Sequence, residues 1–118
     1  MNWNQTILIA LGGSIGAVTR GFINRWLPFV PNQFSWGTFG INLLGCLFIG
    51  ILWSKLESDT QKLFWITGIL GGFTTFSGFG LELLRYLQHK EYSLVFSYGL
   101  GSLILGVLMV WVGQKLAA

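Results

Sequence analysis

The residues with the most unusual chemistry lie between Gly68 and Gly80, in the middle of a long apolar segment. Two adjacent glycines, Gly71 and Gly72, precede two β-branched threonines, Thr74 and Thr75, and this combination disfavours a regular helix. A helix break in an apolar medium is tolerated only where it is buried in protein or lines a polar cavity, and freed carbonyls at such breaks often coordinate cations. Two interpretations stay open: an ion site, or a close-packing face whose threonine hydroxyls bond back to the helix.

Three further side chains could contact an ion. Phe76 and Phe79 are three residues apart and share a helix face. The edge of an aromatic ring is positive and can face an anion, although packing explains most aromatic pairs. Asn42 is the only asparagine in the core of an apolar span, roughly 9 Å inside the expected start of its helix. Such an amide either joins two helices or serves function.

The first apolar segment contains a GxxxG pattern at Gly12 and Gly16, which is typical of close helix packing. It is not a dinucleotide-binding fingerprint, because no strand precedes it and the spacing differs. Arg20 follows one turn later. Its side chain could extend to the membrane interface, or it could form a positive vestibule for anions.

The composition indicates that lipid, rather than water, surrounds these segments. Only 9% of the 118 residues are charged, against about 25% in a typical soluble domain. The chain has 17 glycines, which allow helices to approach closely in a membrane. Its single cysteine and single histidine exclude an intrachain disulfide and a Cys/His metal site. The scattered basic residues form no face for nucleic acid.

Hydropathy divides the chain into four apolar spans, each near the 20 residues that a membrane helix needs. We expect an all-α membrane protein with one domain, 1–118, and helices at roughly 5–23, 36–53, 63–84 and 94–113, the third broken at the midplane. The first span does not resemble a removable signal peptide, because no basic region precedes it. A soluble four-helix bundle is rejected, because no span has a broad charged face.

The distribution of positive charge does not select one orientation in the membrane. Lysine and arginine normally gather on the cytoplasmic side. Here the counts are three at one end and three or four at the other, the fourth being Arg20. We therefore predict insertion in both orientations and antiparallel pairing; the alternative is that the first helix or a partner sets the orientation. The residues at the two ends are Lys55, Lys62 and Lys115, against Arg25, Arg85 and Lys90.

With these motifs in place, the chain resembles the Fluc (CrcB) family of fluoride channels over essentially its full length. The third motif is the most specific of the three. The matching segments are Gly12-Gly13-x-x-Gly16-Ala17-x-x-Arg20, Gly37-Thr38-x-x-x-Asn42-x-x-Gly45 and Gly71-Gly72-x-Thr74-Thr75-Phe76-Ser77-x-Phe79.

The resemblance implies an antiparallel homodimer with two fluoride pores, and a structural Na⁺ shared between the subunits at the helix break. It also implies passive fluoride export across the inner membrane of a prokaryote, which lowers cytoplasmic fluoride, and no enzymatic activity. Hydrogen-bond donors must replace the water around the strongly hydrated anion. The residues implied are Asn42, Thr38, Phe76 and Phe79 in the pore, Ser77, Glu82 and Tyr98 along a polar track, Arg20 in a vestibule, and the Gly71 and Thr74 carbonyls as Na⁺ ligands.

One residue departs from the family pattern. Gly78 stands where the family usually has threonine, so a hydroxyl is missing from the expected polar track. This departure keeps open a heterodimeric channel or a non-transporting accessory subunit. A small multidrug-resistance transporter is a weaker alternative, because the first span has no carboxylate and only Glu82 lies inside any span.

Overall fold

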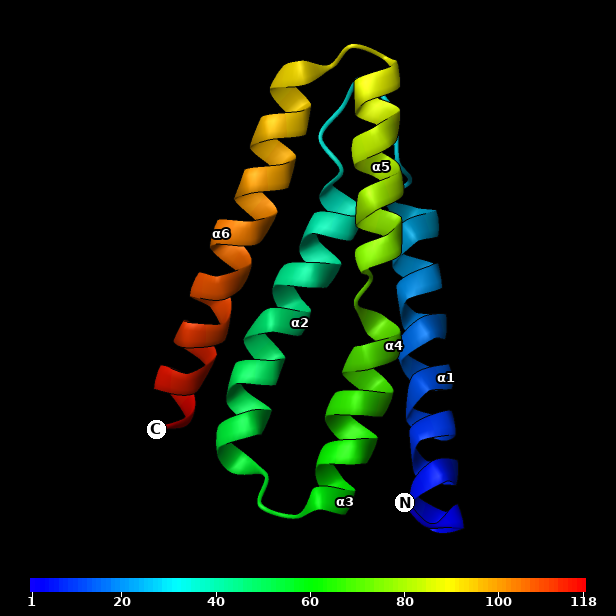
Figure 1. Ribbon diagram of the computed structural model, residues 1–118, viewed down its shortest axis with the longest axis vertical. Helices are drawn as coiled ribbons and strands as arrows, with labels where there is room; N and C mark the ends of the chain where they lie inside the picture. Colours follow the sequence, from blue (N-terminus) through cyan, green and yellow to red (C-terminus); the bar gives the residue numbers. More distant parts are fainter.

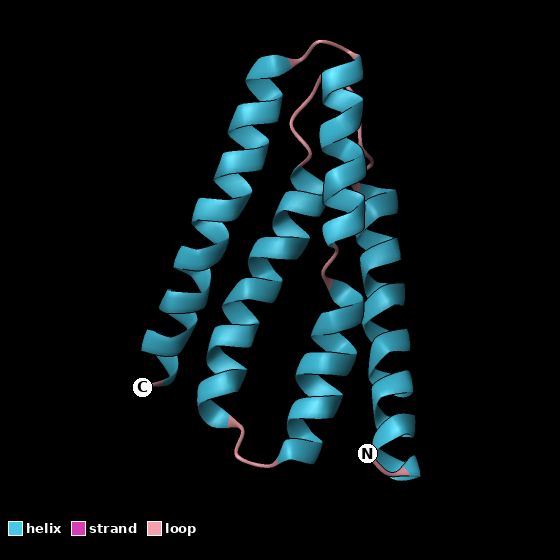
Figure 2. Cartoon of the chain, viewed as in Figure 1, coloured by secondary structure: helices cyan, strands magenta, loops and turns pink.

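The computed structural model describes residues 1–118, and every regular element in it is a helix (Figures 1 and 2). Four segments are long and apolar enough to cross a membrane, and the third of them is composite. The elements are α1 (Trp3–Trp26), α2 (Trp36–Lys55), α3 (Asp59–Lys62), the π-helix η1 (Leu63–Leu70), α4 (Gly71–Phe73), α5 (Phe76–Gln88) and α6 (Tyr92–Ala117).

The four expected spans are confirmed, and their ends lie further out than hydropathy placed them. The third runs from Asp59 to Gln88 and the fourth from Tyr92 to Ala117. Polar residues extend these helices, because helix hydrogen bonds continue into the interface after the apolar pattern stops. Asn2 forms a capping box with Gln5, and the Ser58 hydroxyl accepts from the Gln61 amide at the start of α3.

The surface of the chain is apolar, as expected for a protein surrounded by lipid. Only 15 of 118 residues are buried, and the exposed residues include leucine, isoleucine and valine along α1 and α6. Three of the six tryptophans are the first or last residue of a helix, where the ring and N–H suit the membrane interface. Trp3 and Trp26 are the first and last residues of α1, and Trp36 is the first residue of α2.

Glycine allows the helices to pack closely as two pairs. In the first pair, α1 packs against the stretch formed by η1 and α4; in the second pair, α2 packs against α6. In the first pair, a Cβ on Gly16 would meet the Ile69 carbonyl oxygen. In the second pair, a Cβ on Gly50 would meet the Val110 carbonyl, and one on Gly113 would meet the Leu47 carbonyl. These backbones are therefore in direct contact, with no room for side chains between them.

The two pairs lie side by side, with both chain termini and the link between α2 and α3 at the same end of the molecule (Figure 1). The link between α1 and α2 and the link between α5 and α6 lie at the opposite end. Contact between α2 and the third segment is less extensive than contact within each pair. This arrangement brings the middle of α2 next to the junction of α4 and α5.

Candidate functional site

Regular helix stops at Thr74 and Thr75. Helix α4 ends at Phe73, both threonines have extended backbone with ψ of 158° and 123°, and α5 begins at Phe76. Both threonine side chains satisfy local groups: Thr74 Oγ1 donates to the Leu70 carbonyl at 2.9 Å, and Thr75 Oγ1 accepts from the Gly78 amide at 2.9 Å. The second bond is an N-cap for α5.

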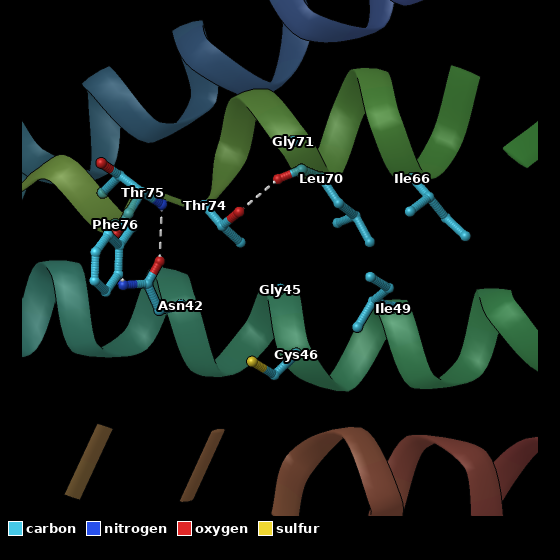
Figure 3. A pocket seen from close by; sticks show the side chains of 10 residues that line it. All are labelled: Asn42, Gly45, Cys46, Ile49, Ile66, Leu70, Gly71, Thr74, Thr75 and Phe76. Carbon is cyan, nitrogen blue, oxygen red and sulfur yellow. Dashed lines mark hydrogen bonds between the residues drawn. The ribbon is translucent and has the colours of Figure 1, made fainter. Parts of the chain in front are cut away.

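Asn42 bridges this junction from α2 (Figure 3). Its Oδ1 accepts from the Thr75 amide at 2.9 Å, and its Nδ2 donates to the Thr75 carbonyl at 3.0 Å. Both polar groups of the extended Thr75 backbone are thereby satisfied by one side chain. The amide nitrogen carries two donors, and one of them stays free.

The carbonyls around the end of α4 differ in their partners. The Leu70 carbonyl accepts from the Thr74 amide and hydroxyl, and the Gly72 carbonyl accepts from Arg20 Nε at 3.0 Å. The Thr74 carbonyl, which lies outside the helices, accepts no hydrogen bond. A helix end normally has such carbonyls satisfied by caps, water or ligands. The Thr74 oxygen is therefore available to a cation, and Gly71 lines the same cavity.

A cavity of about 320 Å³ opens beside the junction, between α2 and the third segment (Figure 3). Predicted site residues from both elements line it, and no lysine or arginine does. Arg20 lies outside this lining. The lining residues are Asn42, Gly45, Cys46, Ile49, Ile66, Leu70, Gly71, Thr74, Thr75 and Phe76.

The two phenylalanines of α5 have different surroundings. Phe76 is 84% exposed, so its ring projects from the chain at the rim of the cavity. Its centroid lies 6.0 Å from that of Phe79. Phe79 packs edge-on against Tyr98 of α6, with 5.1 Å between centroids. The two rings thus lie between the cavity and a cluster of polar side chains further along α5.

This polar cluster consists of three hydroxyl groups around the Glu82 carboxylate. Ser35 and Tyr98 donate to Glu82 Oε1, each at 2.7 Å, and Thr38 donates to Oε2 at 2.9 Å. Tyr98 is fully buried, and Ser35 and Thr38 are almost so. Three hydroxyl donors compensate the carboxylate in a setting that contains no basic partner for it. The residues expected along a polar track therefore fall in one cluster, except Ser77, whose hydroxyl lies 3.4 Å from Thr75 Oγ1.

Gly78 sits directly against the cap of α5. A Cβ at this position would lie 3.0 Å from Thr75 Cγ2 and 3.1 Å from Thr75 Oγ1. A threonine at position 78 would therefore require a small shift of the Thr75 side chain. In this chain, therefore, the position that lacks the hydroxyl lies in close contact with Thr75, the N-cap residue of α5.

The sequence analysis missed two polar side chains near these groups. Ser35 precedes α2, outside the apolar span, where a serine is common and gives no signal of its own. The Ser102 hydroxyl, one turn after Tyr98 on α6, is buried and has no hydrogen-bond partner. Its position in a helix rich in small residues gave no signal that distinguished it from a packing serine.

Comparison with known proteins identifies relatives over most of the chain. The sequence model of the family described as "CrcB-like protein, Camphor Resistance (CrcB)" matches residues 7–114. The chain is 42% identical over 115 residues to the fluoride-specific ion channel FluC of Helicobacter acinonychis (strain Sheeba), covering 92% of this chain and 91% of the relative. It is 45% identical over 111 residues to the protein of the same name from Desulfotalea psychrophila, covering 91% and 87%.

Proposed function

The chain belongs to the CrcB-like family, and from this membership we propose that it is a fluoride-selective channel subunit that conducts the ion passively across a membrane. The observation that carries the proposal is the junction at Thr75, where Asn42 holds an interrupted helix beside a cavity. Relatives of 42% and 45% identity are named fluoride-specific ion channels. Membership in this family also argues against a small multidrug-resistance transporter and against an enzyme.

The chemistry of the site suits a small, strongly hydrated anion. Fluoride needs hydrogen-bond donors in place of water, and it must leave each site as readily as it enters. Asn42 has one free N–H, Ser77 has an exposed hydroxyl, and the rings of Phe76 and Phe79 offer positive edges. No lysine or arginine lines the cavity, so no fixed cation would trap the ion there.

The proposed path runs along α5, from the junction to the hydroxyl cluster. Thr38 and Asn42 are one turn apart on α2, and Phe76, Phe79 and Glu82 follow one another on one face of α5. Tyr98 completes this line from α6 through its contacts with Phe79 and Glu82. In this proposal Arg20 contributes positive charge near the path, as in a vestibule.

We propose that the channel is an antiparallel dimer with two pores. Phe76 is 84% exposed, and the cavity beside it is open, so the site of one chain is incomplete alone. A second copy in the opposite orientation would cover this face and bring two such sites together. Dimers of this kind would insert into the inner membrane of a prokaryote and release cytoplasmic fluoride outward. Gly78 favours a heterodimer as the second candidate.

The proposed sodium ion fits the residues that the family resemblance assigns to it. Sodium is a hard cation that prefers oxygen ligands; the Thr74 carbonyl accepts no hydrogen bond, and Gly71 and Thr74 both line the cavity. They lie in the last turn of the continuous helical stretch formed by α3, η1 and α4, where the helix dipole is negative. When bound, the ion would join the two subunits at the midplane and raise the local potential for an anion.

Liposome efflux tests the proposed function. The purified chain is reconstituted alone with internal potassium fluoride, and release is followed with a fluoride electrode, with chloride release as the control. Rapid fluoride release without chloride release is the expected result. No release from a protein that is dimeric in the membrane would overturn the homodimeric channel and favour the heterodimer, which a second homologous chain would then activate.

A further inference from the structure

Arg20 makes one hydrogen bond in the structure, and its acceptor lies on the third spanning segment. Nε donates to the Gly72 carbonyl at 3.0 Å in a half-buried setting. An arginine inside a membrane span is costly and normally pairs with an acidic group or a backbone carbonyl. The Gly72 carbonyl supplies this partner, so the side chain links α1 to α4.

The glycine contacts between the two helices fix this position. A Cβ on Gly16, one turn before Arg20, would meet the Ile69 carbonyl and the Phe73 amide. A Cβ on Gly72 would meet the Gly13 carbonyl and the Ala17 amide. Because the backbones touch on both sides, Arg20 has little freedom to be placed elsewhere along α4.

Gly72 belongs to the last turn of α4, where the chain leaves regular helix. A cation at the C-terminal end of a helix is favourable, because unpaired carbonyls make that end negative. Arg20 occupies the Gly72 carbonyl from the side of α1, while Gly71 and Thr74 line the cavity on the side of α2. Without this hydrogen bond, the end of α4 would keep its backbone packing against α1 and its link to α2 through Asn42. It would lose the one side-chain hydrogen bond that connects it to α1.

We propose that Arg20 is a positioning residue, which holds the end of α4 so that the carbonyls of Gly71 and Thr74 remain available to a cation. This inference rests on the proposed function where it concerns sodium. It assigns to Arg20 a role in the structure of the junction, beyond the attraction of fluoride in a vestibule.

The two roles predict opposite effects on sodium. Arg20 carries a positive charge near the proposed ion, so removal of that charge alone would favour cation binding. Removal of its hold on Gly72 would disorder the carbonyl ligands and disfavour cation binding. The direction of the change in sodium affinity therefore separates positioning from a purely electrostatic role.

The test compares Arg20→Met and Arg20→Lys with the matched control Arg25→Met, which changes an exposed arginine in the last turn of the same helix. Hydrogen–deuterium exchange of residues 70–78 is measured in lipid nanodiscs. We expect about tenfold faster exchange in Arg20→Met, which corresponds to the loss of one charged hydrogen bond, and no change in Arg25→Met. Arg20→Lys keeps a donor and the charge, and should exchange at a rate between the wild type and Arg20→Met.

The sodium dependence of fluoride efflux is measured on the same proteins. Arg20→Met should need a higher sodium concentration for half-maximal flux, and Arg20→Lys should recover part of the difference. Unchanged exchange at 70–78, or a lower sodium requirement in Arg20→Met, would overturn the proposal. If Arg20→Met does not assemble, Arg20→Gln replaces it under the same criteria. The exchange measurement needs no flux, so a wild-type protein that fails to conduct would overturn the proposed function alone.

Discussion

At the scale of single residues, the geometry of Asn42 is compatible with both roles that the sequence analysis treated as alternatives. Its side chain joins α2 to the third segment, as a structural amide would, through two hydrogen bonds to Thr75. It also keeps one N–H donor beside the cavity. The hydrogen bonds that fix the amide also orient its remaining donor, so the structural contact supports the role in the pore that we propose.

Replacing Asn42 with alanine should abolish fluoride efflux. The substitution removes the remaining donor and leaves the amide and carbonyl of Thr75 unpaired, at a cost of about 1–3 kcal/mol each where they are buried. The measurement is efflux from liposomes, with the dimer checked by cross-linking. The matched control is Asn32→Ala in the exposed loop before α2. Normal flux through Asn42→Ala would remove Asn42 from the pore.

Replacing Phe76 with isoleucine should lower fluoride throughput by at least about tenfold, because isoleucine is apolar but lacks a positive ring edge. The control is Phe96→Ile, an exposed phenylalanine of α6 with no neighbouring ring. Single-channel or bulk efflux rates provide the comparison. If Phe76→Ile and Phe79→Ile both conduct like the wild type, the proposed contact between ring edges and fluoride is wrong.

Sequence patterns identified Asn42 and Arg20 as unusual residues, but they did not identify the groups that these residues contact. Asn42 stood out as the only asparagine in the core of a span, but no pattern indicated that Thr75 is its partner. The position of Arg20 was compatible with several roles, because its partner is a backbone carbonyl and Gly72 carries no side-chain signal. Ser35 and Ser102 were missed because serine is common in loops and in packed membrane helices.

At the scale of helices, two glycine-joined pairs form the framework of the site. The pair of α1 with η1 and α4 fixes the end of α4, and the pair of α2 with α6 fixes Asn42 and Tyr98. The junction at Thr74 and Thr75 lies between these pairs, where Asn42 connects them. The relative positions of the site residues therefore depend on the contact between the two pairs.

Gly16→Ala should weaken the first pair, because the new methyl group would overlap the backbone of Ile69 and Phe73. Overpacking of this kind costs about 1–3 kcal/mol. Unfolding in detergent, followed by circular dichroism, should show the loss. Gly21→Ala is the matched control on the same helix, since no atom lies within 4 Å of its added Cβ. Equal stability of the two variants would contradict direct backbone packing at Gly16.

The helical content and the four spans were predictable, because apolar length in a membrane leaves few alternatives to helix. The first and last turns were not, since Asp59 and Gln88 lie outside the apolar pattern and are helical through caps and continued hydrogen bonds. The π-helix Leu63–Leu70 gave no recognisable signal. Within it, Gly68 packs directly against Gly12 of α1, a contact that a single sequence does not reveal.

At the scale of the whole molecule, the arrangement of charge is nearly symmetric between the two ends. Both termini and the link after α2 lie at one end, with Lys55, Lys62 and Lys115. The other end contains Arg25, Arg85 and Lys90. Because positive residues set orientation, this balance predicts that neither orientation is preferred. An antiparallel homodimer would require such a chain, since both orientations of one sequence must be present in the membrane.

A reporter fused after Ala118 should therefore be found on both sides of the membrane, in roughly equal amounts. Two lysines added at one end should shift this balance strongly, because the starting bias is near zero. Asn32→Lys with Gln33→Lys should hold the end with Arg25 in the cytoplasm and place the C-terminus outside. Gln61→Lys with Gln114→Lys should do the reverse, and serves as the matched control with the same added charge. Fusions to alkaline phosphatase and to green fluorescent protein report the two locations.

A wild-type chain whose C-terminus is found on one side only would contradict dual insertion, and the antiparallel dimer would then require a second, oppositely oriented subunit. Mixing the two lysine variants should restore fluoride efflux that each variant lacks alone, because only the mixture supplies both orientations.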